Sequence, residues 1–545
     1  MKRSYISIII FMIFIIIYFL FYAFYGFNDA DDGFTIALSW RVFNGAIPYK
    51  DFILVRPPLS PLFHTLTLYL VPDNYQIIFE RFLFYFLLAL SSLFGSLSID
   101  KAFKLKEFQI SPYLLATVGF VLSVRNFPPM PWHTVDGIFF ASLGIFILVR
   151  FTTSYSIIFG MLFLFFSALC KQPFYLMPLA GIAYTIITHK DWRKSVVSIL
   201  SLLGFISAFI FIIFKLKALS SFINLTSGST KIRDFLYAGV IKYFSIKSVF
   251  LIVPAVIWVV AQKLSKNKYF SRITVLVPYF FISLLLFYPL PRFIYTVLYK
   301  GIPYNIANSA YFIDSTATLL FFTAIFLFIA NFAVEKKWIS LWFLTLLSWC
   351  ASISWGYQTP VLFSIPLLFG FFIASYQYFK INNLTTLAIY TLLIGTITYY
   401  VAYQKPLGNP VRHDLNYEIS DIFPKLKFIK VGKDIHDKYH ELRSLTNKYG
   451  NNFKTLPGMP LSNYLTNTTS PIPIDWVFNA ETNNNDDDIL NILSQKRPVV
   501  FIEKEPQMIS VTNLKGKFDS PLTYFIKSNW IKVDSTNYFD IYKIK

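Results

Sequence analysis

Three carboxylates directly after the first long apolar run are the residues best suited to chemistry. Asp29, Asp31 and Asp32 fall within four positions. Each charge would be costly inside lipid, so the cluster is expected at or beyond a membrane surface. A carboxylate placed there can act as a general base on an acceptor hydroxyl or amine, or it can hold a divalent cation. Aspartate is also favoured in the first turn of a helix, so at least one of the three is expected to cap the helix that follows.

Basic residues on the same side of the membrane indicate an anionic ligand. Loops outside the membrane are normally poor in Lys and Arg, yet this chain is expected to place Arg56, Lys171 and Arg292 there. Arginine and lysine bind phosphate oxygens well, and the site lies at the depth of lipid headgroups. We therefore predict a lipid-phosphate site that includes Arg56 and Arg292. The alternative for Arg56, which precedes Pro57 and Pro58, is a headgroup anchor.

Four side chains are candidate contacts to a donor or an acceptor: Asp29 of the same cluster, Tyr49, His133 and Tyr357. His133 follows Trp132, and packing at the membrane interface explains it equally well. Lys171 lies between two apolar runs, where a lysine that reaches back to water is tolerated but not required. A role for Lys171 in the site is therefore the preferred interpretation.

The composition places these residues in a membrane protein. Of 545 residues, 55% are hydrophobic and only 14% are charged, which excludes an ordinary soluble domain. The net charge of +20 fits basic cytoplasmic loops and anionic lipid headgroups better than it fits nucleic acid. Cys170 and Cys350 are the only cysteines, so no disulfide framework is available.

Repeated apolar stretches predict about thirteen membrane-spanning helices. The first retains its basic start, Met1 to Arg3, on the cytoplasmic side. Basic loops then follow every even crossing, as the positive-inside rule requires. This topology indicates a multi-pass protein of the inner or plasma membrane, and the first external loop covers residues 28–74, with interfacial helices at 32–44 and 58–70. The predicted spans are 4–27, 75–99, 111–124, 135–149, 156–169, 174–187, 196–214, one that ends before Lys263, 273–290, 316–332, 338–350, 361–376 and 384–403.

The composition changes after residue 403. Asn, Asp, Lys and Pro become frequent and no long apolar run remains, so residues 1–403 are predicted to form the transmembrane domain and residues 404–545 an extracytoplasmic domain. Helices are predicted at 434–447 and 486–494, and strands at 453–456, 499–503, 531–533 and 538–544. Alternating strands and helices favour a small α/β layer. The predicted fold class is thus an α-helical polytopic membrane protein with a C-terminal α/β domain.

The first external loop resembles that of the GT-C glycosyltransferases, in particular the bacterial relatives of protein O-mannosyltransferases and the aminoarabinose transferase of lipid A. The common pattern is an acidic pair after span one, a Gly-x-x-Pro-Tyr turn and a Pro-Pro-Leu helix start. The matching residues here are Asp31, Asp32 and Gly33, then Gly45, Pro48 and Tyr49, then Pro57, Pro58, Leu59 and Pro61. Lys171-Gln172-Pro173 and the stretch 456–460 are also similar to the family. The many-span plan with an external α/β domain agrees with the family plan.

This resemblance implies an inverting transferase with a polyprenyl-phosphate-linked sugar as donor. Asp31 matches the catalytic acidic position of the family, and Asp32 stands where the family usually has Glu. Lys171, with Arg56 and Arg292, is expected to bind the donor phosphate. Some relatives use a divalent metal and some do not, so Asp31 and Asp32 are the candidate ligands if Mg²⁺ or Mn²⁺ is used. The acceptor is expected outside the cytoplasm and can be a lipid, a glycan or a protein.

Three other classes of protein compete with this interpretation. A lipid-linked glycan flippase or transporter would need ionisable residues inside the spans, whereas the acidic residues here are predicted to fall almost wholly in loops. An O-antigen polymerase or ligase type of envelope protein does not need an Asp pair after span one. A non-catalytic scaffold for envelope assembly would function without that pair.

Overall fold

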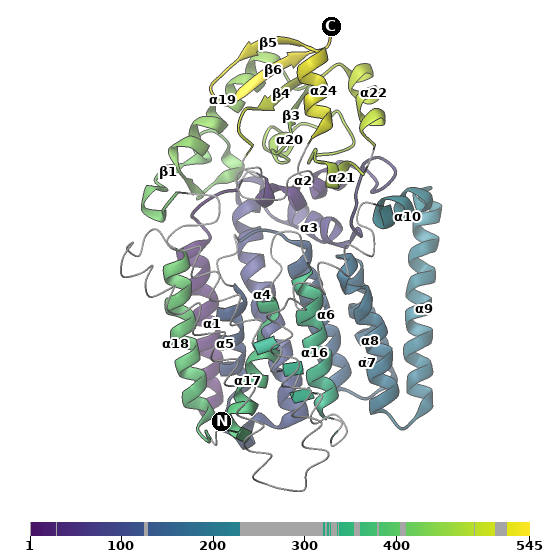
Figure 1. Ribbon diagram of the computed structural model, residues 1–545, viewed down its shortest axis with the longest axis vertical. Helices are drawn as coiled ribbons and strands as arrows, with labels where there is room; N and C mark the ends of the chain where they lie inside the picture. Colours follow the sequence, from purple (N-terminus) through teal and green to yellow (C-terminus); the bar gives the residue numbers. More distant parts are fainter. Residues whose placement is uncertain are drawn as a thin grey trace, which may run out of the picture.

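Apolar helices run along the long axis of the molecule and form a bundle (Figure 1). The computed structural model describes residues 2–28, 30–124, 129–228, 320–321, 324–325, 327–328, 335, 337–353, 360–378, 381–403, 410–483, 485–506 and 520–545. The bundle helices are α1 (Lys2–Tyr22), α4 (Gln76–Phe103), α5 (Pro112–Val124), α6 (His133–Arg150), α7 (Ser154–Ala168), α8 (Leu176–Thr188), α9 (Trp192–Lys215), α16 (Lys337–Ser352), α17 (Ile365–Tyr378) and α18 (Leu384–Tyr403). Within the described ranges, four helices are long and apolar enough to cross a membrane: α1, α4 with the preceding turn, α6 and α9.

Ten of the predicted spans coincide with these bundle helices, with ends that shift by a few residues. The agreement follows from long apolar runs, which leave a helix as the only way to satisfy the backbone inside lipid. The predicted spans that end before Lys263 and at 273–290, and most of 316–332, lie outside the described residues. The predicted total of about thirteen therefore stays a prediction.

Burial differs sharply among the apolar helices. Only 22% of the apolar window of α1 and 17% of that of α9 are buried, whereas 72% of α6 and 61% of α4 are. Helices α4 and α6 therefore form the interior of the bundle. Small residues allow the close approach of α6 and α7, because a Cβ on Gly144 would lie 2.8 Å from the carbonyl oxygen of Gly160.

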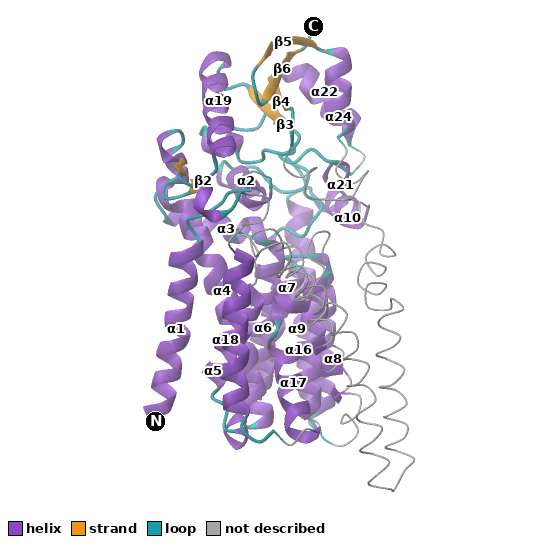
Figure 2. Ribbon diagram, turned by 60° about the vertical axis from the view of Figure 1, so that its left-hand side comes forward, coloured by secondary structure: helices purple, strands orange, loops and turns teal. Residues whose placement is uncertain are grey.

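Two helices of the first loop, α2 (Asp31–Phe43) and α3 (Leu59–Leu70), lie between the bundle and the C-terminal part of the chain (Figure 2). Their bounds agree with those of the two helices predicted in the first external loop. In α3, His64 and Leu68 face inward and are buried, whereas Leu66 and Leu70 are exposed. An apolar outer face suits a helix at the edge of a lipid layer. Beside the loop between α2 and α3, α10 (Leu219–Gly228) packs the ring of Phe222 against Tyr49.

The C-terminal part of the chain forms a mixed sheet covered by helices. The strand order is β3-β4-β6-β5; β3 runs parallel to β4, and the other two pairs are antiparallel. The predicted strands and the two predicted helices are all present, and the structure adds a helix at Pro521–Asn529 and short elements that were not predicted. The elements are β3 (Phe453–Leu456), β4 (Val499–Glu503), β5 (Ile531–Ser535), β6 (Phe539–Lys543), α19 (Lys433–Tyr449), α22 (Asp486–Lys496) and α24 (Pro521–Asn529), with the short α20 (Ser462–Leu465), α21 (Asn479–Thr482), β1 (Tyr417–Glu418) and β2 (Lys430–Val431).

The C-terminal sheet and the helix bundle share one hydrophobic core. The backbone of Lys430 pairs with the chain just after α1, since its N–H donates to the carbonyl of Phe24 and its carbonyl accepts from Gly26. Tyr464 donates its hydroxyl to Gln76 Oε1 at 2.8 Å. The two termini lie at opposite ends of the molecule (Figure 1). The first-loop helices are thus enclosed between an apolar bundle and a polar α/β layer.

Candidate active site

The start of α2 is organised by Asn28 and Asp32 together. Asn28 Oδ1 accepts from the N–H groups of Ala30 and Asp31, both at 3.0 Å. In return, Asp32 Oδ2 accepts from the N–H of Asn28 at 3.0 Å. This reciprocal arrangement is the logic of a capping box, and it confirms that one of the aspartates serves the helix start. Asp31 begins the helix beside it and is half-buried.

Asp32 also forms a buried ion pair with Arg81 of α4. Arg81 Nη2 lies 2.9 Å from Asp32 Oδ2, and both side chains are buried. The same guanidinium donates to the carbonyls of Ala23 and Gly26 at 2.7 and 2.8 Å. Arg81 therefore holds the end of α1, the turn after it and the start of α2 on α4. Asp32 is therefore placed to position α2.

The structure brings Arg56 and Lys171 together, although they are far apart in the sequence. The loop of Arg56 is fixed to the end of α7 by two hydrogen bonds: Leu59 N–H to the carbonyl of Leu169 at 2.9 Å, and Gln172 Nε2 to the carbonyl of Val55 at 2.7 Å. Lys171 Nζ then donates to Thr134 Oγ1 at 2.9 Å, next to His133 on the first turn of α6.

Burial, and after it the charge of Arg56, lower the pKa of Lys171 to about 7. An amine in this state is only partly charged at neutral pH. An anion bound between the two side chains would favour the charged form and relieve the repulsion. A pair of cations that is unfavourable when empty and favourable when filled is typical of an anion site.

His133 lies within electrostatic range of Arg56, Lys171 and His64. Its Nδ1 is 3.4 Å from Thr35 Oγ1, and its ring faces Phe34, both on α2. We call Arg56 and Lys171 the cation group; His133 lies beside it and is not one of its charges. The first loop and the turn after α7 contribute the two cations.

A buried triad of ionisable side chains lies beside the cation group. His64 on α3 places Nδ1 2.7 Å from Glu80 Oε2 on α4 and Nε2 3.2 Å from both carboxylate oxygens of Asp136 on α6. All three side chains are at most 2% exposed. Burial alone would lower the pKa of His64, but the charges of Glu80 and Asp136 and the hydrogen bonds to them raise it to about 10. His64 is thus a buried cation held by two carboxylates.

The sequence interpretation missed this triad, and it was wrong to place the acidic residues almost wholly in loops. Glu80 and Asp136 both fall inside predicted spans, Glu80 just after the first turn of α4 and Asp136 in the first turn of α6. Ionisable residues in apolar helices are a signal for function in themselves. Applied to Glu80, Arg81 and Asp136, that signal would have found them. Their position at the helix starts explains how they reach the polar layer.

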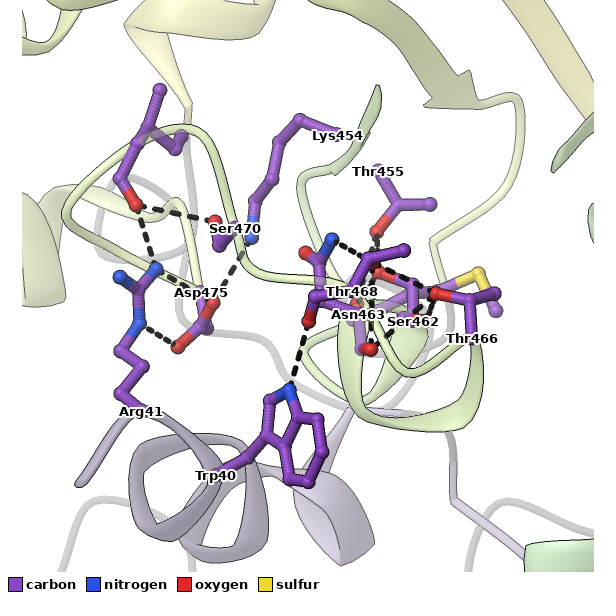
Figure 3. A network of polar contacts seen from close by, with 12 residues as sticks. Trp40, Arg41, Lys454, Thr455, Ser462, Asn463, Thr466, Thr468, Ser470 and Asp475 are labelled. Carbon is purple, nitrogen blue, oxygen red and sulfur yellow. Dashed lines mark hydrogen bonds and ion pairs between the residues drawn. The ribbon is translucent and has the colours of Figure 1, made fainter. Parts of the chain in front are cut away.

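The C-terminal part of the chain covers the site and adds residues to it. The ring of Trp476 packs at a tilt against Phe34 with centroids 4.8 Å apart, and Glu481 pairs with Arg56. Figure 3 shows a second link, in which Arg41 of α2 and Lys454 of β3 both bind Asp475. Burial would raise the pKa of Asp475, but these two cations lower it. No motif predicted these contacts.

The other candidate residues are distributed as follows. Tyr49 is buried and donates its hydroxyl to the carbonyl of Arg56 at 2.6 Å, so it supports the loop. Asp29, Arg292 and Tyr357 lie outside the described residues. Within the described ranges, no group of three or more His, Cys, Asp or Glu side chains is arranged to hold a metal ion. Asp32, one of the two predicted metal ligands, is bound by Arg81 instead.

Solved structures similar to this chain include two of ArnT from Cupriavidus metallidurans. The apo structure matches 99% of this chain and 98% of its own, with a TM-score of 0.43 and 10% identity. The structure bound to undecaprenyl phosphate matches 98% and 97%, with a TM-score of 0.43 and 11% identity. No protein-family model and no curated protein matches the chain.

Proposed function

We propose that this chain is a membrane glycosyltransferase that moves a sugar from a polyprenyl-phosphate donor to an acceptor on the non-cytoplasmic side. The observation that carries the proposal is that the loop of Arg56 is hydrogen-bonded to the end of α7 beside Lys171, so that the two cations act on each other. A lipid-linked phosphate needs an apolar surface for its chain and cations for its headgroup at the same level. The cation group supplies the second requirement, and the bundle supplies the first.

The proposed reaction is an inverting displacement at the anomeric carbon of the sugar. The acceptor oxygen or nitrogen forms a bond to that carbon, while the bond from the carbon to the phosphate oxygen breaks. The leaving polyprenyl phosphate gains negative charge, which Arg56 and Lys171 are placed to stabilise as it develops. A carboxylate takes the proton of the acceptor. We assign that role to Asp31, which matches the catalytic position of the resembled family.

Asp32 has a different role in this proposal. Its carboxylate is bound by Arg81 and by the N–H of Asn28, so it holds the start of α2 in place. Asp31 is then presented by a helix whose position is fixed from both sides. Asp32 is a positioning residue, and Asp31 is the proposed base.

The proposal is tested by transfer of radiolabelled sugar from polyprenyl-phosphate donors by the reconstituted protein. Wild type is compared with Asp31→Asn and Lys171→Met. The matched controls are Asp51→Asn and Lys50→Met, which alter exposed residues of the same loop. We expect transfer by wild type and both controls, and a loss of about a hundredfold or more in the two site variants.

Two other outcomes would change or contradict the proposal. Equal turnover by wild type and Asp31→Asn would keep the transferase but move its base away from the first loop. No turnover by folded wild type with any donor would contradict the transferase itself.

A lipid-linked glycan transporter is the second candidate. The observation that favours it is the triad of His64, Glu80 and Asp136, because buried ionisable groups in apolar helices also mark transport paths. An assay in sealed vesicles distinguishes the two functions. A transporter moves the intact labelled lipid across the bilayer without cleaving it, whereas a transferase releases label from the lipid.

A further inference from the structure

Glu481 binds Arg56 in the geometry that a phosphate would use. Its Oε2 accepts from Nη1 at 2.7 Å and its Oε1 accepts from Nη2 at 2.5 Å. The pair is largely removed from water, with 17% of the Arg56 side chain and 6% of the Glu481 side chain exposed. The guanidinium also lies over the ring of Phe34, with Cζ 4.8 Å from the centroid. The side chain of Arg56 is therefore held by both a carboxylate and an aromatic face.

Arginine recognises carboxylates and phosphates by the same two-pronged arrangement of N–H groups. A carboxylate that uses Nη1 and Nη2 together occupies the edge that a phosphate would prefer. We infer that Glu481 is a residue of the donor site that holds Arg56 while the site is empty and is displaced from it by the lipid phosphate. The inference rests on the proposed function, since it takes Arg56 to be a phosphate ligand.

The surroundings allow Glu481 to leave Arg56 without detaching the C-terminal part of the chain. The segment that leads to α21 is anchored upstream of Glu481. Trp40 Nε1 donates to the carbonyl of Thr468 at 2.8 Å, and Ile53 N–H donates to the carbonyl of Pro473 at 2.7 Å. Asp475 is bound by two cations of its own. The segment before Glu481 therefore stays bound to the first loop when the carboxylate leaves Arg56.

The charges favour a phosphate that replaces Glu481 at Arg56 over a phosphate that binds beside Glu481. Arg56 and Lys171 repel each other, while Glu481 forms an ion pair with Arg56. A phosphate that enters beside a retained Glu481 would face a like charge in a poorly hydrated place, which is costly. A phosphate that replaces Glu481 gains both cations. Glu481 thus acts as an internal competitor for the donor.

The test is the affinity of the purified protein for a fluorescent polyprenyl monophosphate at pH 7. Glu481→Gln keeps the shape of the side chain and removes its charge, so we expect binding on the order of tenfold tighter than in wild type. Glu481→Asp keeps the charge but shortens the side chain by one methylene, and we expect a smaller gain. Glu418→Gln removes the same charge from the exposed strand β1 and is expected to change the affinity less than twofold.

Unchanged or weaker binding by Glu481→Gln would overturn the inference and make Glu481 a residue that only positions Arg56. If that variant does not fold, Glu481→Asp decides the question in the same way. Arg56→Gln separates this failure from failure of the proposed function. Loss of binding in Arg56→Gln would support Arg56 as a ligand of the donor phosphate even if the Glu481 variants bind as wild type does. Wild-type affinity in Arg56→Gln would exclude Arg56 from the donor site.

Discussion

At the scale of single residues, the site depends on charges whose state the fold has changed. Lys171 is a buried amine beside Arg56, and its pKa is lowered to about 7. His64 is a buried imidazole between two carboxylates, and its pKa is raised to about 10. Lys171 is expected to gain a proton when an anion binds. His64 stays charged at neutral pH and binds Glu80 and Asp136. Both states predict a pH dependence, of donor binding for Lys171 and of stability for His64.

Donor binding is predicted to weaken as the pH rises from about 6 to about 8, because Lys171 loses its charge across a pKa of about 7. A sugar-bearing polyprenyl phosphate is a diester, so its own single charge does not change in that range. Binding of such a donor, measured at several pH values, should fall by several-fold in wild type. Lys171→Arg stays charged and should show a flat profile at high affinity. A flat profile in wild type would contradict the role of Lys171.

His64 is predicted to stabilise the fold most at low pH. Its pKa is about 10 in the fold against about 6.5 when unfolded. The stabilisation is therefore complete below about pH 6.5 and is lost as the pH rises toward about 10. The midpoint of thermal unfolding in detergent should fall with pH over this window in wild type. Lys171 contributes the opposite slope, so the comparison is between wild type and His64→Gln. Parallel curves for the two proteins would show that His64 is not charged in the fold.

At the scale of elements, α2 is held against the bundle by one ion pair at its start. Arg81 of α4 binds Asp32 and the carbonyls of Ala23 and Gly26. A buried pair of this kind adds little compared with an apolar pair of the same size, but removal of one partner leaves an uncompensated charge. The pair therefore specifies where α2 lies more than it stabilises the protein.

This arrangement predicts different effects for the two neighbouring aspartates. Asp32→Asn leaves Arg81 uncompensated and should lower the free energy of unfolding by about 3–5 kcal/mol. Asp31→Asn should change it by less than about 1 kcal/mol while it abolishes sugar transfer. Chemical denaturation in detergent and the transfer assay together check both statements. A stable but inactive Asp32→Asn protein would reverse the two roles.

At the scale of the whole molecule, the site is enclosed because the C-terminal part of the chain packs directly on α2. Gly33 lies at a close approach, since a Cβ there would lie 2.3 Å from Leu461 Cγ. Trp476 covers Phe34, and Asp475 binds Arg41. These contacts join the first loop to residues more than four hundred positions later in the chain.

The contact at Gly33 gives a prediction about the whole assembly. Gly33→Ala improves helix propensity by about 1 kcal/mol, yet the clash with Leu461 should make it destabilising by about 1–3 kcal/mol. Leu461→Ala removes the clashing side chain at a cost of about 2–5 kcal/mol. The double variant should be more stable than the sum of the two single effects predicts, as measured by the free energies of unfolding. Strict additivity would mean that α2 and Leu461 do not touch in solution.

Local patterns in the sequence determined the elements of this protein. Long apolar runs have to be helices in lipid, so ten predicted spans coincide with observed helices. Strands β3 and β4 were predicted as short buried strands, and all of their residues except Val499 are buried. The sequence also predicted a site at the polar stretch after α1 and at the cations Arg56 and Lys171, since charges in such positions are unusual.

Only the tertiary structure decided which of these residues work together. The pairing of Arg56 with Lys171, of Asp32 with Arg81 and of Glu481 with Arg56 joins positions that no local period relates. The sequence could not separate Asp31 from Asp32, because both satisfy the same helix-start preference. Packing of α4 against the start of α2 gives Asp32 a partner and thereby assigns the two carboxylates different environments. A role in catalysis depends on such neighbours, and long-range packing determines the neighbours.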